Sequence, residues 1–337
     1  MNSSTNFNVY FYQMRENIRY KNHTRLLQIF LPIICSYGMV VNLLSVFVIY
    51  RNFKKSVFLN LENQISMAFY SLIGLGLTNF WICFTSFPLV YLPKVHRRKD
   101  IFYYYAIHGP GLVNIGLTIN VWIVSLISVG RCIAVYKPIF WRLLSKSIKV
   151  NIFTFSSLIL GSVMIRLPDL IFTYYGMKVK FKETVFIIHF TINMFMFVYK
   201  IFLGVLTYIL PFLIVVTSTI MMIIKLRTRG QYYRSAIPFN NSRKKHLIRL
   251  LIISIMLFIF CSFPFETLHL VLNYTIMWME SQSKISQENL INYYNFNIIV
   301  QWTSYLQIIG SVVDCSVYFL ASKYYRRSLR KMIHNWR

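Results

Sequence analysis

Long apolar stretches of the sequence contain ionisable residues inside them or at their ends, among them Arg131, Arg166, Asp169, Glu266, His269 and Asp314. Isolated ionisable groups in such stretches are candidates for ligand recognition or for switching, because a charge is costly to place there. Their spacing does not indicate catalysis, since the sequence contains no HExxH motif, no GxSxG motif and no pair of histidines spaced to bind a metal. We therefore expect a binding or signalling protein, with no enzyme activity, no cofactor and no metal.

The composition predicts which kind of structure must position these residues. The chain of 337 residues is 56% hydrophobic and only 13% charged, with a mean hydropathy of +0.53, whereas soluble domains carry about 25% charged residues. Such a chain needs lipid as part of its solvent. The net charge of +27 does not indicate nucleic-acid binding, because the basic residues form short clusters between apolar runs. Five cysteines are scattered singly, a pattern that is typical of buried thiols and not of a zinc site.

A window of about 19 residues, the length needed to cross the hydrocarbon core, predicts seven membrane spans. They lie at 27–50, 64–90, 104–136, 149–173, 197–225, 246–274 and 295–320. The fold class expected is an all-α membrane protein, a seven-transmembrane helix bundle over residues 27–320. An N-terminal segment, 1–26, precedes the bundle, and a short amphipathic helix and tail, 321–337, follow it. The apolar residues 184–196 are too few for a span and are expected to form a loop strand in a hairpin.

The distribution of Lys and Arg predicts the orientation of the bundle. With the N-terminus outside, the cytoplasmic segments hold 22 basic residues and the extracellular segments hold 13. Basic residues concentrate on the cytoplasmic side, so we expect the N-terminus outside and the C-terminus inside. The glycosylation sequons at Asn2, Asn22 and Asn273 would then face the exterior, and the protein would be a glycoprotein.

Several short motifs resemble those of the rhodopsin-like G-protein-coupled receptors. Arg131, in "SVGRCIAVYKP" at the end of the third span, resembles the central residue of the family's Asp-Arg-Tyr motif. The first span holds Asn42 in "GMVVNLLSV", and the fifth holds Pro211 in "YILPFLIVV". "FCSFPF" keeps Pro264 of the sixth-span motif, and "DCSVYFLASKYYRR" keeps Tyr318 of the family's Asn-Pro-x-x-Tyr motif.

The resemblance covers about residues 27–335 and implies a function. The eroded motifs, short loops and Phe-, Tyr- and Ile-rich spans look most like nematode serpentine chemoreceptors, and "ASKYYR" is similar to the branch related to FMRFamide-type peptide receptors. A plasma-membrane receptor of this kind would sense an extracellular small organic molecule or short peptide and activate a heterotrimeric G protein. The alternatives are a seven-span ligand-gated channel or transporter, or a non-signalling protein with the receptor fold.

The same resemblance implies a switch at the cytoplasmic face, formed by Arg131, Tyr318 and Lys244. Gly130 stands where the family has an acid beside the arginine, and Lys244 stands where an opposing acid often lies in the sixth span. Two basic residues repel each other, so no ionic restraint on Arg131 is expected. Arg131 would contact the G protein, or it would only extend its charge to the membrane surface.

A polar core is also implied, formed by Asn42, Ser71, Asn120 and Asp314. Ser71 stands where the family usually has a carboxylate in the second span, so Asp314 resembles a relocated acid. An unpaired buried acid would tend to be protonated. Asp314 could serve helix packing or switching.

The ligand pocket is expected at Arg166, Asp169, Glu266 and His269, which lie toward the outer halves of the fourth and sixth spans. Arg166 and Asp169 are three residues apart and could instead pair along one helix, and Glu266 could be a polar residue satisfied between helices. Val113 stands where amine receptors have an Asp, and the seventh span contains no Lys, so neither a monoamine nor retinal is expected. The family's outer disulfide is not expected, because Ala106 stands near one of its positions and 173–197 contain no Cys.

Overall fold

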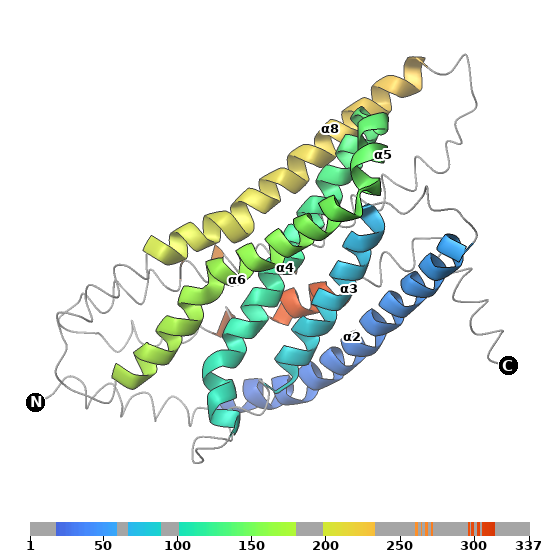
Figure 1. Cartoon of the computed structure of the whole chain (residues 1–337). Coiled ribbons are helices and arrows are strands. Elements are labelled where there is room, and N and C mark those ends of the chain that lie inside the picture. The colour runs from blue at the N-terminus through green and yellow to red at the C-terminus, as the bar shows by residue number, and fades with distance from the viewer. Residues whose placement is uncertain are drawn as a thin grey trace, which may run out of the picture.

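The computed structural model describes residues 18–58, 67–88, 101–179 and 198–232, together with individual residues between 260 and 313. Within these ranges the regular elements are all helical, which confirms the all-α fold class. In chain order they are α2 (Ile18–Phe58), α3 (Met67–Ser86), α4 (Ile101–Tyr136), α5 (Pro138–Lys146), α6 (Ile148–Val179), the π-helical turn η3 (Val205–Ile209) and α8 (Leu210–Tyr232) (Figure 1). The strand expected at 184–196 lies outside the described residues.

Four of the helices in the described ranges are long and apolar enough to cross a membrane, with mean hydropathies between 1.6 and 2.3. Their apolar parts are Ile29–Arg51, His108–Tyr136, Lys149–Pro168 and Val198–Lys225. These segments lie at the predicted first, third, fourth and fifth spans. The helices themselves run further, since α2 begins at Ile18 and ends at Phe58. Of the predicted sixth span only individual residues are described, and of the predicted seventh span the run 305–313 and a few residues before it. All of these residues are helical.

Helix α4 lies at the centre of the described bundle, against α3, α6 and α8 (Figure 1). One buried apolar cluster joins α2, α3 and α4 to the seventh span, with Cys35, Ile82, Val113 and Ile308 among its members. A second cluster joins α3 and α4 to Val215 of α8. The central helix therefore carries the residues around which the other helices pack.

The segment between α4 and α6 forms the short helix α5. Lys137 is not helical, and Pro138 follows as the first residue of α5, where a proline costs no backbone hydrogen bond. Ser147 separates α5 from α6, and its hydroxyl oxygen accepts a hydrogen bond from the Val150 amide at 3.4 Å. Ser147 is thus an N-cap for α6. Helix α5 was not predicted, because only the basic charge of this segment was considered.

The fifth span contains a local irregularity next to a proline. Pro211 has no amide hydrogen to donate within α8, and the π-helical turn η3 lies directly before it. The Ser125 hydroxyl of α4 donates to the Pro211 carbonyl oxygen at 3.3 Å. The irregular part of this span is therefore held against α4.

Candidate functional site

The Arg166 side chain of α6 points into the bundle and is only 5% exposed. Its Nε donates a hydrogen bond to Thr118 Oγ1 of α4 at 2.9 Å, and its Nη2 donates to the Tyr208 hydroxyl of η3 at 3.0 Å. Its Cζ also lies 5.9 Å from the centroid of the Tyr208 ring. The guanidinium thus joins three helical elements at one point. A planar cation with five donors can bind the two oxygens of a carboxylate there.

Local geometry prepares two neutral partners of Arg166, Thr118 and Tyr208. The Thr118 hydroxyl donates its own hydrogen to the Asn114 carbonyl oxygen at 2.9 Å, so its oxygen lone pairs are available to Arg166. Tyr208 is 3% exposed and packs against Val121. The Tyr199 hydroxyl donates to the Ile165 carbonyl oxygen at 2.6 Å and fixes the start of the fifth span against α6. Sequence reasoning missed Thr118 and Tyr208, because neither is charged at neutral pH.

The other residues of the predicted ligand pocket receive no test from the structure. Asp169 lies in α6, but its side chain is outside the described residues, as are Glu266 and His269. Val113 is buried in the cluster between α2, α3 and α4, so an apolar residue does occupy this position inside the bundle. The pairing of Arg166 with Asp169 along α6 stays a prediction.

The predicted polar core is partly described. Asn120 Nδ2 of α4 donates to Asn79 Oδ1 of α3, and both side chains are buried. Ser71 is 1% exposed. Asn42 is fully buried, and its amide atoms have no hydrogen-bond partner among the described residues. Asp314 lies outside those residues, so the convergence of Asn42, Ser71, Asn120 and Asp314 stays a prediction. The partner of Asn120, Asn79, was not predicted from the sequence.

The structure explains why a glycine stands beside Arg131. A Cβ atom at Gly130 would lie 2.6 Å from Cη2 of Trp141, whose ring packs over this turn of α4 from α5. A side chain at residue 130 therefore requires the indole to move. Arg131 itself is partly buried near the end of α4. Tyr318 and Lys244, the other residues of the predicted switch, lie outside the described part of the chain.

The same end of α4 is joined to α8 by a contact that the sequence analysis did not predict. The Tyr136 hydroxyl donates to the Met221 carbonyl oxygen at 3.1 Å. Lys225 Nζ lies 5.3 Å from the centroid of the Tyr136 ring, a cation–π distance. Two hydrogen bonds therefore join α4 to α8. One links Ser125 to Pro211, and the other, closer to the end of α4, links Tyr136 to Met221.

The predicted glycosylation sites are not tested either. Asn22 lies within α2, although its side chain is not described, and Asn2 and Asn273 lie outside the described residues.

Residues 42–309 match the family model of the 7 transmembrane receptor (rhodopsin family). The match covers most of the chain, and the protein belongs to this family. No curated protein matches the sequence significantly.

Membership makes the protein a G-protein-coupled receptor, a multi-pass protein of the plasma membrane that responds to an extracellular ligand and acts on a G protein. Members of this family are signalling receptors and not enzymes. The resemblance seen in the sequence is confirmed at this level, and the channel and transporter alternatives lose their support.

Proposed function

We propose that the protein is a chemosensory receptor for an extracellular small organic molecule or short peptide, with its N-terminus outside the cell. The bias of basic residues, 22 against 13, supports this orientation. The eroded motifs and aromatic-rich spans support kinship with nematode serpentine chemoreceptors, including the branch related to FMRFamide-type peptide receptors. No particular ligand is implied by either feature.

The observation that carries the proposal is the inward-facing guanidinium of Arg166. In the proposed orientation it lies in the outer half of the bundle, where it would meet a ligand that enters from outside. A guanidinium inside the bundle favours a ligand with a carboxylate or another acidic group, which it would bind beside the hydroxyls of Thr118 and Tyr208. We assign Asp169, Glu266 and His269 to the same pocket on their positions in the fourth and sixth spans.

A ligand at Arg166 would act on the helices that Arg166 contacts. Tyr208 belongs to η3, next to Pro211, and α8 is bonded to α4 at Pro211 and Met221. A ligand that binds one arrangement of these contacts more tightly than another shifts the population toward it. Arg131 would then contact the G protein, with Tyr318 and Lys244 beside it at the cytoplasmic face. Asn42, Ser71, Asn120 and Asp314 would form the polar core between the two ends.

A matched ligand panel tests the proposal. Cells that express the receptor are exposed to short-chain carboxylic acids and to the methyl ester of each acid, and G-protein activation is measured against cells without the receptor. We expect acids to activate at lower concentrations than their esters, because esterification removes the charge. A receptor that responds to esters as well as to acids, or only to esters, would refute the role given to Arg166.

Arg131 is tested in the same assay. Arg131→Ala should reduce agonist-driven G-protein activation at matched surface expression, while ligand binding changes little. A full response in Arg131→Ala would leave this residue as an arginine that only extends to the membrane surface.

A further inference from the structure

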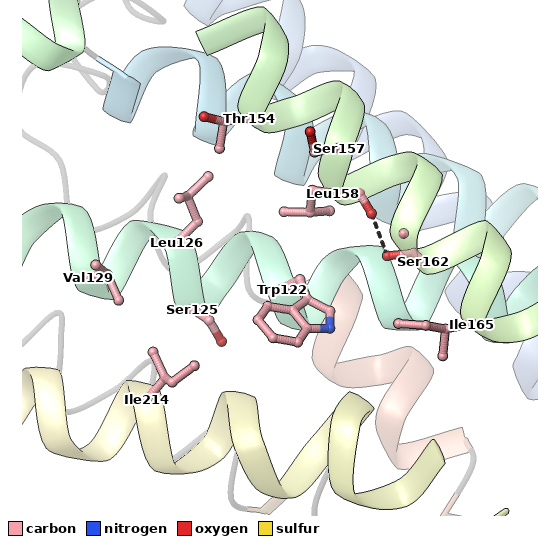
Figure 2. Close-up of a pocket in the computed structure, with 11 residues that line it drawn as sticks. Trp122, Ser125, Leu126, Val129, Thr154, Ser157, Leu158, Ser162, Ile165 and Ile214 are labelled. Carbon is pink, nitrogen blue, oxygen red and sulfur yellow. Dashed lines mark hydrogen bonds between the residues drawn. The ribbon is translucent and has the colours of Figure 1, made fainter. Parts of the chain in front are cut away.

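A cavity of about 430 Å³ lies between α4, α6 and α8, and Arg166 is not among its lining residues (Figure 2). Its lining residues all fall within the apolar spans His108–Tyr136, Lys149–Pro168 and Val198–Lys225. Ser157, which lines it, is exposed. The neighbouring α6 residue Leu160 is 64% exposed. The cavity is therefore accessible from the hydrocarbon of the bilayer, and its volume lies in the range of about 300–1,000 Å³ that small-molecule sites occupy.

Most hydroxyl groups around the cavity are already used by the helices. Ser125 donates to Val121 O at 3.0 Å and to Pro211 O at 3.3 Å. Thr154 and Ser162 donate to the carbonyl oxygens four residues earlier, each at 2.8 Å. Apart from Trp122 and Ser157, the other side chains that line the cavity are aliphatic, such as Leu158. The cavity is thus mainly apolar, and apolar cavities do not retain water.

Two hydrogen-bond donors on opposite walls of the cavity, unlike the hydroxyls of Ser125, Thr154 and Ser162, have no acceptor among the described residues. In the part of the chain that the structure describes, neither the Trp122 indole N–H of α4 nor the Ser157 hydroxyl of α6 makes a hydrogen bond. Figure 2 draws both side chains at the cavity. A polar group without a partner in hydrocarbon is unfavourable. An occupant with a hydrogen-bond acceptor would remove this cost.

The depth of Trp122 limits what the occupant can be. Trp122 lies fourteen residues from each end of the span His108–Tyr136, close to the middle of the membrane. The ester groups of a phospholipid and the hydroxyl of a sterol lie at the interface, about 15 Å from the middle of a core about 30 Å thick. These anchored lipids cannot bring their oxygen atoms to Trp122. The acceptor must belong to a molecule that dissolves in the interior of the bilayer.

We propose that this cavity binds a neutral, lipophilic small molecule with one hydrogen-bond acceptor, such as a long-chain ketone or ester, which enters from the bilayer. The acceptor bonds to Trp122, and the chain lies along the aliphatic walls. Ser125 on one wall is bonded to Pro211, so the occupant also contacts the α4–α8 junction. The proposal concerns binding and does not depend on which ligand or G protein the receptor uses.

Photoaffinity labelling of the purified full-length receptor in phosphatidylcholine nanodiscs tests the site. The probe is a long-chain methyl ketone with an alkyl diazirine and a terminal alkyne, and labelled peptides are mapped by mass spectrometry. The competitors are methyl undecyl ketone and tridecane, which have the same chain length but differ in the carbonyl. We expect labels on the segments 122–129 and 154–165, and competition by the ketone at concentrations about two- to tenfold lower than by the alkane, as one neutral hydrogen bond predicts.

Three variants locate the occupant. Gly161 lines the cavity, and a Cβ atom there would meet nothing within 4 Å. Gly161→Leu should therefore place its side chain in the cavity, and labelling of both segments should be lost. Ser156→Leu makes a similar change on exposed α6 surface outside the cavity, and labelling should persist. Trp122→Phe should keep the labelling but remove the preference for ketone over alkane.

Each alternative outcome refutes a stated part of the proposal. Equal labelling in Gly161→Leu and in the unmodified receptor, or labels spread evenly over the outer faces of α2 and α6, would show general contact with the bilayer and no site. Equal competition by ketone and alkane would show an apolar cleft without a role for Trp122. Absence of labelling on both segments while the probe labels other parts of the receptor would overturn the proposal altogether.

Discussion

Helices α4 and α6 are both apolar spans, yet they differ in how much of their surface they bury and in the kinds of residue that they bury. In the most apolar part of α4, 61% of the residues are buried, against 17% in α6. Among the described side chains of α6, the buried ones are Asn151, Ser162 and Arg166, all polar. Its exposed side chains include Phe153, at 72%, and Leu160. In α6 hydrophobicity therefore marks the lipid face and polarity marks the interior.

Helix α4 buries both kinds of residue, since it meets helices on several sides. Apolar residues such as Ile123 fill the contacts with α3 and α8, and polar residues such as Asn120 bond across the bundle. In a span such as α6, which exposes most of its surface, few residues are buried. A polar residue among them is therefore a candidate for a functional role. Arg166 is ionisable, buried and on the inner side of a mainly exposed helix, and these properties together make it a candidate for a functional role.

The largest effect expected from this contrast is that of a charge on the outer face of α6. Leu160→Arg should lower surface expression strongly, because an arginine in the middle of a span costs about 2.5–3.5 kcal/mol on insertion scales. The native Arg166 is tolerated because its side chain faces protein groups. Surface labelling of tagged receptors measures the change, with Leu160→Met as the volume-conserving control. Normal expression of Leu160→Arg would contradict the assignment of this face to lipid.

A smaller effect is expected at the polar contact between α3 and α4. Hydrogen bonds between membrane helices contribute about 0.6 kcal/mol on average and up to about 1.7 kcal/mol. A double-mutant cycle with Asn79→Leu and Asn120→Leu, measured by the thermal stability of the purified receptor, should give a coupling energy of this size. The exposed Ser156 of α6 provides the comparison, since Ser156→Ala should change stability by less than about 0.5 kcal/mol. Additive effects of the two Asn substitutions would mean that this pair is not coupled.

The smallest effect concerns ligand-independent signalling at Arg131. An acid at residue 130 would restrain Arg131, but an exposed ion pair is worth only about 0–1 kcal/mol. Gly130→Asp must also displace Trp141, so Gly130→Ala is the necessary control. Basal G-protein activation at matched expression should be lower in Gly130→Asp than in Gly130→Ala. Equal basal signals in the two variants would show that an acid at residue 130 does not restrain Arg131.

Sequence alone predicted the features that depend on one segment at a time. The apolar runs predicted the spans of α2, α4, α6 and α8, because the hydrocarbon thickness sets their length. Arg166 was predicted as a site residue because an isolated charge in such a run is unusual.

Features that depend on two distant segments were not predicted. Thr118 and Tyr208 lie 48 and 42 residues from Arg166 along the chain, and Asn79 lies 41 residues from Asn120. Their types are common in membrane helices, so only the rotation of each helix about its axis identifies them as partners. The need for glycine at residue 130 depends likewise on Trp141, which belongs to another helix.

The most direct test of Arg166 as the anchor of an acidic ligand is G-protein activation by the most active carboxylic acid of the panel, measured for Arg166→Gln and Arg166→Lys. The account predicts that Arg166→Gln raises the half-maximal concentration of the acid about ten- to hundredfold at matched surface expression, because a charge-assisted hydrogen bond is worth about 1.5–3 kcal/mol. The half-maximal concentration for Arg166→Lys should lie between those of the unmodified receptor and of Arg166→Gln, since lysine keeps the charge but loses the forked geometry. An unchanged response to the acid in Arg166→Gln would contradict the central claim.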